Sequence, residues 1–371
     1  MKRGNLDLSV EDEFNRLALE VFRHQVEASP VYGSFVRARG VDPVRVQDWN
    51  EIPAVPTAAF KEVPLGSVGS RPAEAVFRTS GTSQGRRARG VHSVHDLSLY
   101  RDSLLATSRR FLGPAFGTPP VTDNIRTTNF RFLFVAPAPE ALPDSSLLFM
   151  FGAWMREWDD GGGRFLADST WRIPKGRLQQ ELEACRRTMT PVLLGGTAFS
   201  FGQLLEEIGE SGVPPLAKGS VVLETGGFKG RVRSVPRPAL YRAISRTFNI
   251  PTTRIVNEYG MTELLSQFYE PVLLEGGPED LEQRRHLGPP WVRTRILDPY
   301  TLEPSGDGNV GILCHMDLAN LDSVSAILTD DLGHAVDDGF RIMGRAEGAE
   351  TRGCSLIVEE LGRAAGASPE E

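Results

Sequence analysis

The sequence predicts a layered α/β fold with a β-rich lobe towards its C-terminal end. Short apolar runs at 130–139, 191–196 and 219–226 end in Pro or Gly, which is typical of buried strands. Stretches with helical spacing follow the last two runs. From about 271 to 343, β-branched runs alternate with Asp-Gly and Pro turns, which indicates hairpins. In layered α/β folds, ligands bind at the carboxyl ends of the strands.

The individual elements follow from local patterns. Apolar residues recur at helical spacing after Ser9, so we expect an amphipathic helix that ends before Pro30. Prolines punctuate 48–63, which favours extended chain. Helices are expected at 197–212, closed by a glycine, and at 238–250.

Size, charge and cysteine content exclude several classes of protein. At 371 residues the chain exceeds what one hydrophobic core usually serves, and its net charge of -7 disfavours a nucleic-acid surface. Cys185, Cys314 and Cys354 lie far apart, so they form neither a disulfide framework nor a zinc motif. The first residues lack the apolar run of a signal peptide, and no later apolar run is long enough to cross a membrane, so we expect a cytoplasmic protein.

Residues 77–87, "FRTSGTSQGRR", combine glycines, hydroxyls and arginines. Hydroxyls and exposed N–H groups can wrap an oxyanion, and glycines let the backbone approach closely. The Walker A spacing is absent. A polar hairpin is the alternative interpretation.

Residues 257–263, "NEYGMTE", place an aromatic ring, a hydroxyl and two carboxylates around one glycine. Tyr259 could stack on a planar ring, Thr262 could donate to a phosphate, and Glu263 could hold Mg²⁺. Further along, Asp330 and Asp331 end an apolar run, where one could accept ribose hydroxyls or both could form a turn.

Taken in order, "TSGTSQG", "YGMTE", "TDD" and "GR" resemble the signature of the adenylate-forming superfamily of acyl- and aryl-acid ligases. The resemblance implies the large N-terminal α/β domain of those enzymes, with a phosphate loop at 79–85. The superfamily's lysine after this loop is replaced here by Arg86 and Arg87, which keeps the charge and changes the donor geometry.

The resemblance implies a role for each motif. Nucleotide-binding residues would be Thr79, Ser80, Gly81, Thr82, Ser83, Gly85, Gly226, Gly227, Glu258, Tyr259, Gly260 and Asp331. The cofactors would be ATP and Mg²⁺, with Glu263 as the metal ligand. Thr262 would contact the α-phosphate, and Arg345 would clamp the ribose or a phosphate from a Gly-Arg hinge.

The segment after the Gly-Arg hinge indicates which family within the superfamily the sequence resembles. No lysine follows Lys229, so the small C-terminal domain and its late catalytic lysine are expected to be missing or vestigial. The stretch "RGCSL" resembles the acyl-protein synthetases, also called luciferin-component ligases, which transfer an acyl group from an adenylate to their own cysteine. We therefore expect a large domain at 1–343 and, at 344–371, a hinge and a tail carrying Cys354.

Cys354 is the expected acyl acceptor, before a hand-over to a partner protein such as a reductase or carrier. Arg352 would assist its ionisation, because positions two apart share a face of an extended segment. Packing is the alternative role for this cysteine, and the expected role for Cys185 and Cys314. His92 and His95 could line the carboxylate site or be structural.

Two other functions stay open. A truncated relative of the phenylacetate–coenzyme A ligases would form an aryl-adenylate and would not need Cys354. A nucleotide-binding subunit without catalysis would bind ATP only. The combination of Thr262, Glu263 and Asp331 argues against the second, because a scaffold needs neither Mg²⁺ nor ribose contacts.

Overall fold

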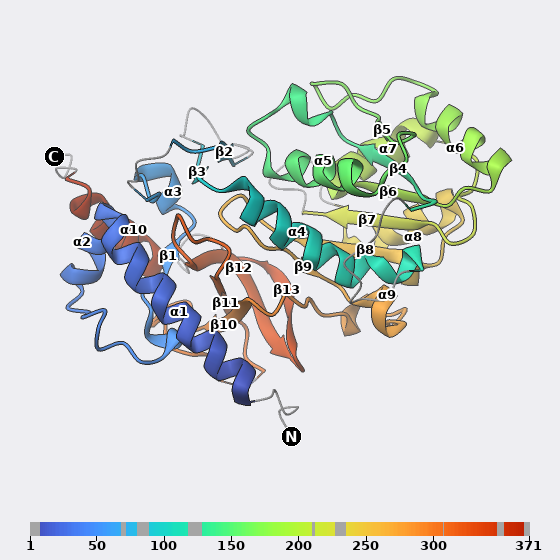
Figure 1. Cartoon of the computed structure of the whole chain (residues 1–371). Helices are drawn as coiled ribbons and strands as arrows, with labels where there is room; N and C mark the ends of the chain where they lie inside the picture. Colours follow the sequence, from blue (N-terminus) through green and yellow to red (C-terminus); the bar gives the residue numbers. More distant parts are fainter. Residues whose placement is uncertain are drawn as a thin grey trace.

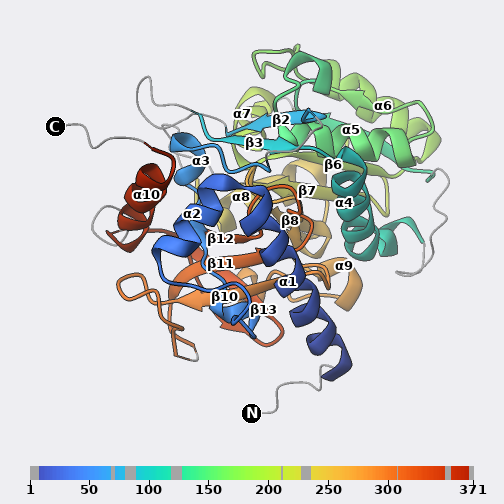
Figure 2. The ribbon, with the colours of Figure 1, turned by 60° about the vertical axis from the view of Figure 1, so that its left-hand side comes forward.

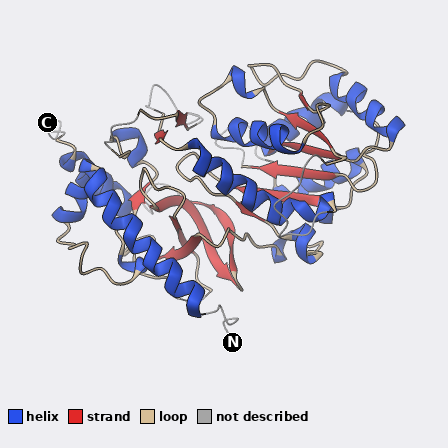
Figure 3. Cartoon of the chain, in the orientation of Figure 1, coloured by secondary structure: helices blue, strands red, loops and turns tan. Residues whose placement is uncertain are grey.

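A computed structural model describes the protein at 8–67, 72–79, 89–117, 128–209, 212–226, 235–306, 308–346 and 352–366. In these residues the strands form a six-stranded sheet, a five-stranded sheet and a two-stranded hairpin. Helices cover the two larger sheets (Figure 1 and Figure 3). The predicted mixed α/β class is confirmed.

The six-stranded sheet is mainly parallel and has the order β5-β4-β6-β7-β8-β9. Only β9, at its edge, runs antiparallel to its neighbour. The strands are β4 (Arg131–Val135), β5 (Arg164–Phe165), β6 (Val192–Thr197), β7 (Val221–Thr225), β8 (Ile255–Tyr259) and β9 (Phe268–Tyr269). The apolar runs of the sequence analysis supply β4, β6 and β7.

Helices cover both faces of this sheet because its strands are apolar on both sides. Val222 packs with α6 (Arg177–Thr188), α7 (Ala198–Ile208) and α8 (Arg237–Phe248). Its neighbour Leu223 points the other way, towards α4 (Leu97–Leu112) and α5 (Ser146–Trp158). Successive residues at the ends of β7 and β8 therefore face different surroundings.

The five-stranded sheet has the order β1-β12-β11-β10, and β13 also pairs with β12. The strands are β1 (Val55–Pro56), β10 (Val292–Leu297), β11 (Gly311–Asp317), β12 (Ala326–Val336) and β13 (Gly339–Arg345). All its pairs are antiparallel except β1 with β12. The covering helices are α1 (Leu8–Ala28), α2 (Pro30–Ala38), α3 (Ala59–Glu62) and α10 (Arg352–Ala364).

The N-terminal helices and the C-terminal helix pack on this second sheet. Gln25 Nε2 on α1 donates to the Asn320 carbonyl at 2.6 Å, and Arg39 Nε pairs with Glu360 Oε2 at 2.8 Å. Figure 2 shows α10 beside α2, which it contacts. The first sixty residues thus complete the C-terminal lobe.

The hairpin and the short helices complete the described chain. Strands β2 (Ala75–Arg78) and β3 (Val91–Val94) are antiparallel and flank the predicted phosphate loop. The remaining elements are α9 (Val272–Glu275), η1 (Trp49–Glu51), η2 (Gly113–Phe116), η3 (Pro139–Ala141), η5 (Thr252–Arg254) and η6 (Leu281–Gln283).

Most local predictions are confirmed and two are wrong. The amphipathic helix ends at Ala28 and α7 is capped by Gly209, as expected. Residues 59–62 form α3 although extended chain was expected. Residues 352–364 form α10, so the extended segment predicted around Cys354 is incorrect.

Candidate active site

Asp331 lies where two of the sequence motifs meet. The Tyr259 hydroxyl donates to its Oδ2 at 2.8 Å, and Arg345 Nε donates to its Oδ1 at 3.0 Å. Strand pairing explains the second contact, because Asp331 on β12 stands opposite Arg345 on β13. The Arg345 side chain is 60% exposed and that of Asp331 11%. A carboxylate is therefore held in place beside a cation that solvent reaches.

The charges at this centre shift the pKa of its members. Burial and the neighbouring Asp331 raise the pKa of Tyr259 well above 10, so it stays a neutral donor. Burial alone would lower the pKa of Arg345, but Asp331 and Asp330 outweigh it and raise this pKa. Asp331 thus faces one permanent cation and one phenol.

Glu258 and Thr225 form a cross-strand pair at the carboxyl ends of β8 and β7. The Thr225 hydroxyl donates to Glu258 Oε2. A side chain at Gly260 would approach Glu258 Oε1 to 2.6 Å, so only glycine fits there without a shift. Gly226, with φ +69°, adopts a left-handed conformation that favours glycine. The predicted residues Gly226, Glu258 and Gly260 thus lie at one edge of the sheet.

Thr262 and Glu263 follow on the turn between β8 and β9. Asn320 Nδ2 donates to the Glu263 carbonyl at 2.7 Å, and His92 Nδ1 lies 2.7 Å from the Thr262 carbonyl. Glu263 is buried. His92 is therefore a structural partner of a predicted site residue.

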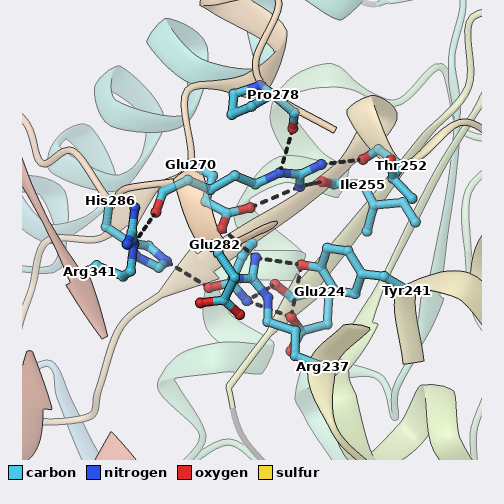
Figure 4. Close-up of polar contacts among 12 residues, drawn as sticks. Glu224, Arg237, Tyr241, Thr252, Ile255, Glu270, Pro278, Glu282, His286 and Arg341 are labelled. Carbon is cyan, nitrogen blue, oxygen red and sulfur yellow. Dashed lines mark hydrogen bonds and ion pairs between the residues drawn. The ribbon is translucent and has the colours of Figure 1, made fainter. Parts of the chain in front are cut away.

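A buried polar network backs this edge of the sheet on its α8 side (Figure 4). Asn257 Nδ2 donates to Glu224 Oε2 at 2.5 Å, and its Oδ1 accepts from His286 Nε2 at 2.7 Å. Burial raises the pKa of Glu224 to about 7, against the opposing effects of Arg237 and Asn257. Burial lowers the pKa of His286 to about 4, so the imidazole is neutral.

The network extends into a buried ion pair. Glu270 accepts from Arg237 and, at 3.2 Å, from Arg284 Nη1. The side chains of Glu270 and Arg284 are both 0% exposed. Neither residue belongs to a recognisable motif. The signal that could have predicted the network is Glu224, a carboxylate within the apolar run of β7, because a charged residue inside a folded core must be paired.

Several predicted residues lie outside the described part of the structure. They are Ser80, Gly81, Thr82, Ser83, Gly85, Arg86, Arg87 and Gly227. Thr79 is described: it pairs with Gly90 across the base of the loop, its N–H donating at 3.0 Å and its Oγ1 accepting at 2.9 Å.

Cys354 lies in the first turn of α10, but its side chain, like that of Arg352, is outside the description. The backbone here is helical, so the extended segment through which Arg352 was expected to assist Cys354 is wrong. Cys185 and Cys314 are buried among apolar residues, as expected for packing.

Two classes of site or segment are missing from the described residues. They contain no group of three or more His, Cys, Asp or Glu side chains that could hold a metal ion. No helix among them has both the length and the apolar character needed to cross a membrane.

Comparison with solved structures identifies the class of fold. The chain is similar to a 2-hydroxyisobutyryl-CoA ligase crystallised in an open conformation with 2-HIB-AMP and CoA. The TM-score is 0.64 at 16% identity, over 92% of this chain and 76% of the ligase. The fold is that of the adenylate-forming ligases, and the predicted fold class is confirmed.

Sequence comparison shows which proteins of that class the chain resembles. The profile of the family described as acyl-protein synthetase, LuxE, matches residues 203–361. A long-chain-fatty-acid–luciferin-component ligase of Aliivibrio fischeri is 27% identical, over 76% of this chain and 69% of its own. Its counterpart from Vibrio harveyi is 24% identical, over 93% and 87%. The chain is a relative of the acyl-protein synthetases and an acid ligase by class, as the motifs predicted.

Proposed function

We infer that this enzyme uses ATP to convert a fatty acid to an acyl-adenylate and then transfers the acyl group to a cysteine thiol. The observation that carries the proposal is Asp331, held between Tyr259 and Arg345. Residues of three motifs, separated by up to 86 positions, meet in these two hydrogen bonds, as a shared nucleotide site would require. The names of the relatives support a long-chain acid.

The first step makes a poor electrophile reactive. A carboxylate oxygen attacks the α-phosphorus of ATP, the bond to the pyrophosphate oxygen breaks, and a mixed anhydride with AMP forms. No proton has to move, so catalysis consists of positioning and of neutralising phosphate charge. Arg345 is suited to that role because its guanidinium is a permanent, partly exposed cation.

Each predicted residue has a role in this step. The remaining lone pairs of the Asp331 carboxylate would accept hydrogen bonds from the ribose hydroxyls, and Tyr259 would border the adenine. Thr262 would contact the α-phosphate, and the 79–85 loop would bind the β- and γ-phosphates. These assignments place the nucleotide at the carboxyl ends of β7 and β8.

In this proposal Mg²⁺ would be bound mainly by the nucleotide, and Glu263, next to Thr262 in the sequence, would provide one carboxylate. Magnesium commonly binds through one or two carboxylates together with substrate phosphates. When bound, it would neutralise phosphate charge.

In the second step the Cys354 sulfur attacks the acyl carbon, the bond to AMP breaks, and a thioester forms as the thiol proton leaves. Cys354 lies in the first turn of α10. An acylated cysteine needs a further acceptor, so a cytoplasmic partner protein, a reductase or a carrier, belongs to this proposal.

The test is the intact mass of the protein after incubation with ATP, Mg²⁺ and a mixture of fatty and aryl acids. We expect one acyl group on the wild type, released by hydroxylamine, and none on Cys354→Ala. Cys185→Ala is the matched control and should acylate normally, because Cys185 is buried in the helical layer.

The other outcomes identify the alternatives. Pyrophosphate release with an aryl acid and without a covalent adduct would indicate an adenylate-forming ligase that does not use Cys354. ATP binding without pyrophosphate release would indicate a non-catalytic subunit and would overturn the proposal.

A further inference from the structure

The turn at Thr262 and Glu263 is held through two consecutive backbone carbonyls. His92 Nδ1 contacts the Thr262 carbonyl, and Asn320 Nδ2 donates to the Glu263 carbonyl, both at 2.7 Å. The two side chains come from different segments, His92 from β3 and Asn320 from the turn after β11. Each carbonyl thus has its own side-chain donor, from a different part of the fold.

The tautomer of His92 follows from its partner. A carbonyl oxygen can only accept, so Nδ1 carries the proton and donates. His92 is 2% exposed, and the edge of its ring contacts Phe60 with centroids 5.6 Å apart. Nε2 is buried and has no partner among the described residues. Burial lowers the pKa of His92 to about 4, although the bond to Thr262 opposes this shift.

His92 also belongs to the frame of the phosphate loop. In the hairpin His92 pairs with Phe77, and Phe77 precedes the start of the loop at Thr79 by two residues. Thr79 and Gly90 close the base of the loop with two hydrogen bonds. A shift of β3 would therefore move Gly90, at the base of the loop, and the donor to Thr262 together.

We propose that His92 is a positioning residue that holds the Thr262 carbonyl in register with the phosphate-loop hairpin. This inference rests on the proposed function, in which Thr262 and the loop contact different phosphates of one ATP molecule. The imidazole sets the distance between the two contacts without touching the nucleotide. It acts as a neutral donor throughout the physiological pH range.

The rest of the turn has its own anchors. Asn320 Oδ1 and Asp317 Oδ2 both accept from the Leu265 N–H, at 2.9 and 3.0 Å. The loss of the His92 donor would therefore leave residues 263–265 fixed and release mainly Thr262. We expect the rate of adenylation to fall, while the apparent affinity for the acid changes little.

The experiment compares His92→Leu, which removes the donor, with His92→Asn, whose amide can place an N–H near the position of Nδ1. ATP–pyrophosphate exchange gives kcat and KM for each. We expect kcat of His92→Leu to fall by about tenfold to a hundredfold, because small misplacements have such effects. His92→Asn should recover most of the loss. His24→Leu, an exposed change on α1, is the control and should match the wild type.

Equal kcat values for His92→Leu and His92→Asn would overturn the proposal. A second measurement addresses the hydrogen bond itself and does not need turnover. Nitrogen-15 spectra of wild-type imidazoles should show a His92 signal of the Nδ1–H tautomer, absent from His92→Asn and unchanged between pH 8 and 5. A titrating signal or the other tautomer would overturn the inference.

These measurements distinguish a failure of the proposed function from a failure of the positioning role of His92. If the wild type performs no pyrophosphate exchange with any acid, the proposed function fails. His92 is then judged by its spectrum and by ATP affinity measured calorimetrically. Affinities that are equal for His92→Leu and His92→Asn would count against a positioning role, and weaker binding by His92→Leu alone would support it.

Discussion

Two carboxylate–arginine clusters of this protein differ in what surrounds them. Glu270 and Arg284 are fully buried, and Arg284 also donates to the carbonyls of Thr252, Ile255 and Pro278. Asp331, in the middle of β12, pairs with Arg345 at the end of β13, and the arginine side chain is largely exposed to solvent. The first pair joins segments of the core, and the second leaves a charged surface available to a ligand.

The difference teaches how to separate architecture from function among ion pairs. A buried pair loses its solvation on folding and is satisfied entirely by protein groups, so breaking it affects stability. A pair that keeps one partner in solvent adds little stability, and its geometry is free to serve binding. The same chemical groups therefore predict opposite phenotypes at the two positions.

The largest effect is expected for Glu270→Gln. This change removes the carboxylate that pairs with Arg237 and Arg284. Arg284 is fully buried, so its charge would be left without a counter-charge and without water. The free energy of unfolding should fall by about 3–5 kcal/mol, measured by urea titration. Arg345→Met is the matched control at the open pair, with an expected loss of about 1 kcal/mol or less. Similar losses for both variants would remove the distinction.

Asp331→Asn should show the reverse pattern. A hydrogen bond to a charged group contributes about 1.5–3 kcal/mol, so pyrophosphate exchange should slow by about tenfold to a hundredfold. Its thermal midpoint should stay close to that of the wild type, since Tyr259 keeps an acceptor. Unfolding of the variant at the assay temperature would count against a binding role for this carboxylate.

The smallest effect concerns pH and Glu224. In the folded protein the pKa of Glu224 is raised to about 7, whereas the usual pKa of glutamate is 4.5. The stability that the protonated Glu224 contributes is therefore lost as the pH rises from 4.5 to about 7. Glu224→Gln lacks this titration. Its free energy of unfolding relative to wild type should therefore rise by about 1–3 kcal/mol between pH 5 and 8.

Buried histidines change stability in the opposite direction, but they do so in both proteins. The pKa values of His92 and His286 are lowered to about 4, so the free energy of unfolding that these two residues contribute falls as the pH falls. Their contribution cancels in the difference between Glu224→Gln and wild type. Parallel curves for the two proteins, measured by urea titration across this range, would show that Glu224 is ionised throughout.

Local patterns were sufficient to predict the strands that carry the site. Short apolar runs ending in glycine gave β6 and β7, and the motif at 257–263 gave the turn after β8. The order of these motifs also gave the fold class. Asp331 and Arg345 were both singled out, because each belongs to a short motif that can be recognised without knowing its neighbours.

Long-range contacts could not be predicted in the same way. His92 contacts a main-chain carbonyl 170 positions away. Every residue has such a carbonyl, so the sequence does not indicate which one is the partner. The Glu270–Arg284 pair depends on which loops close over β8. The helix α10 was missed for another reason: Ile357 and Leu361, both buried, are spaced by four, but the motif around Cys354 dominated the interpretation.

The pairing of β1 with β12 has a consequence for synthesis of the chain. Val55 stands beside Ile327, so the first strand of the chain has no partner until more than 270 further residues have been made. The apolar cluster that α1 and α2 join also contains residues made late, such as Leu313 and Ile327. Such non-local closure slows folding. The N-terminal sixty residues are therefore the part of the nascent chain that most needs protection by chaperones, and the C-terminal lobe is the last to become resistant to proteases.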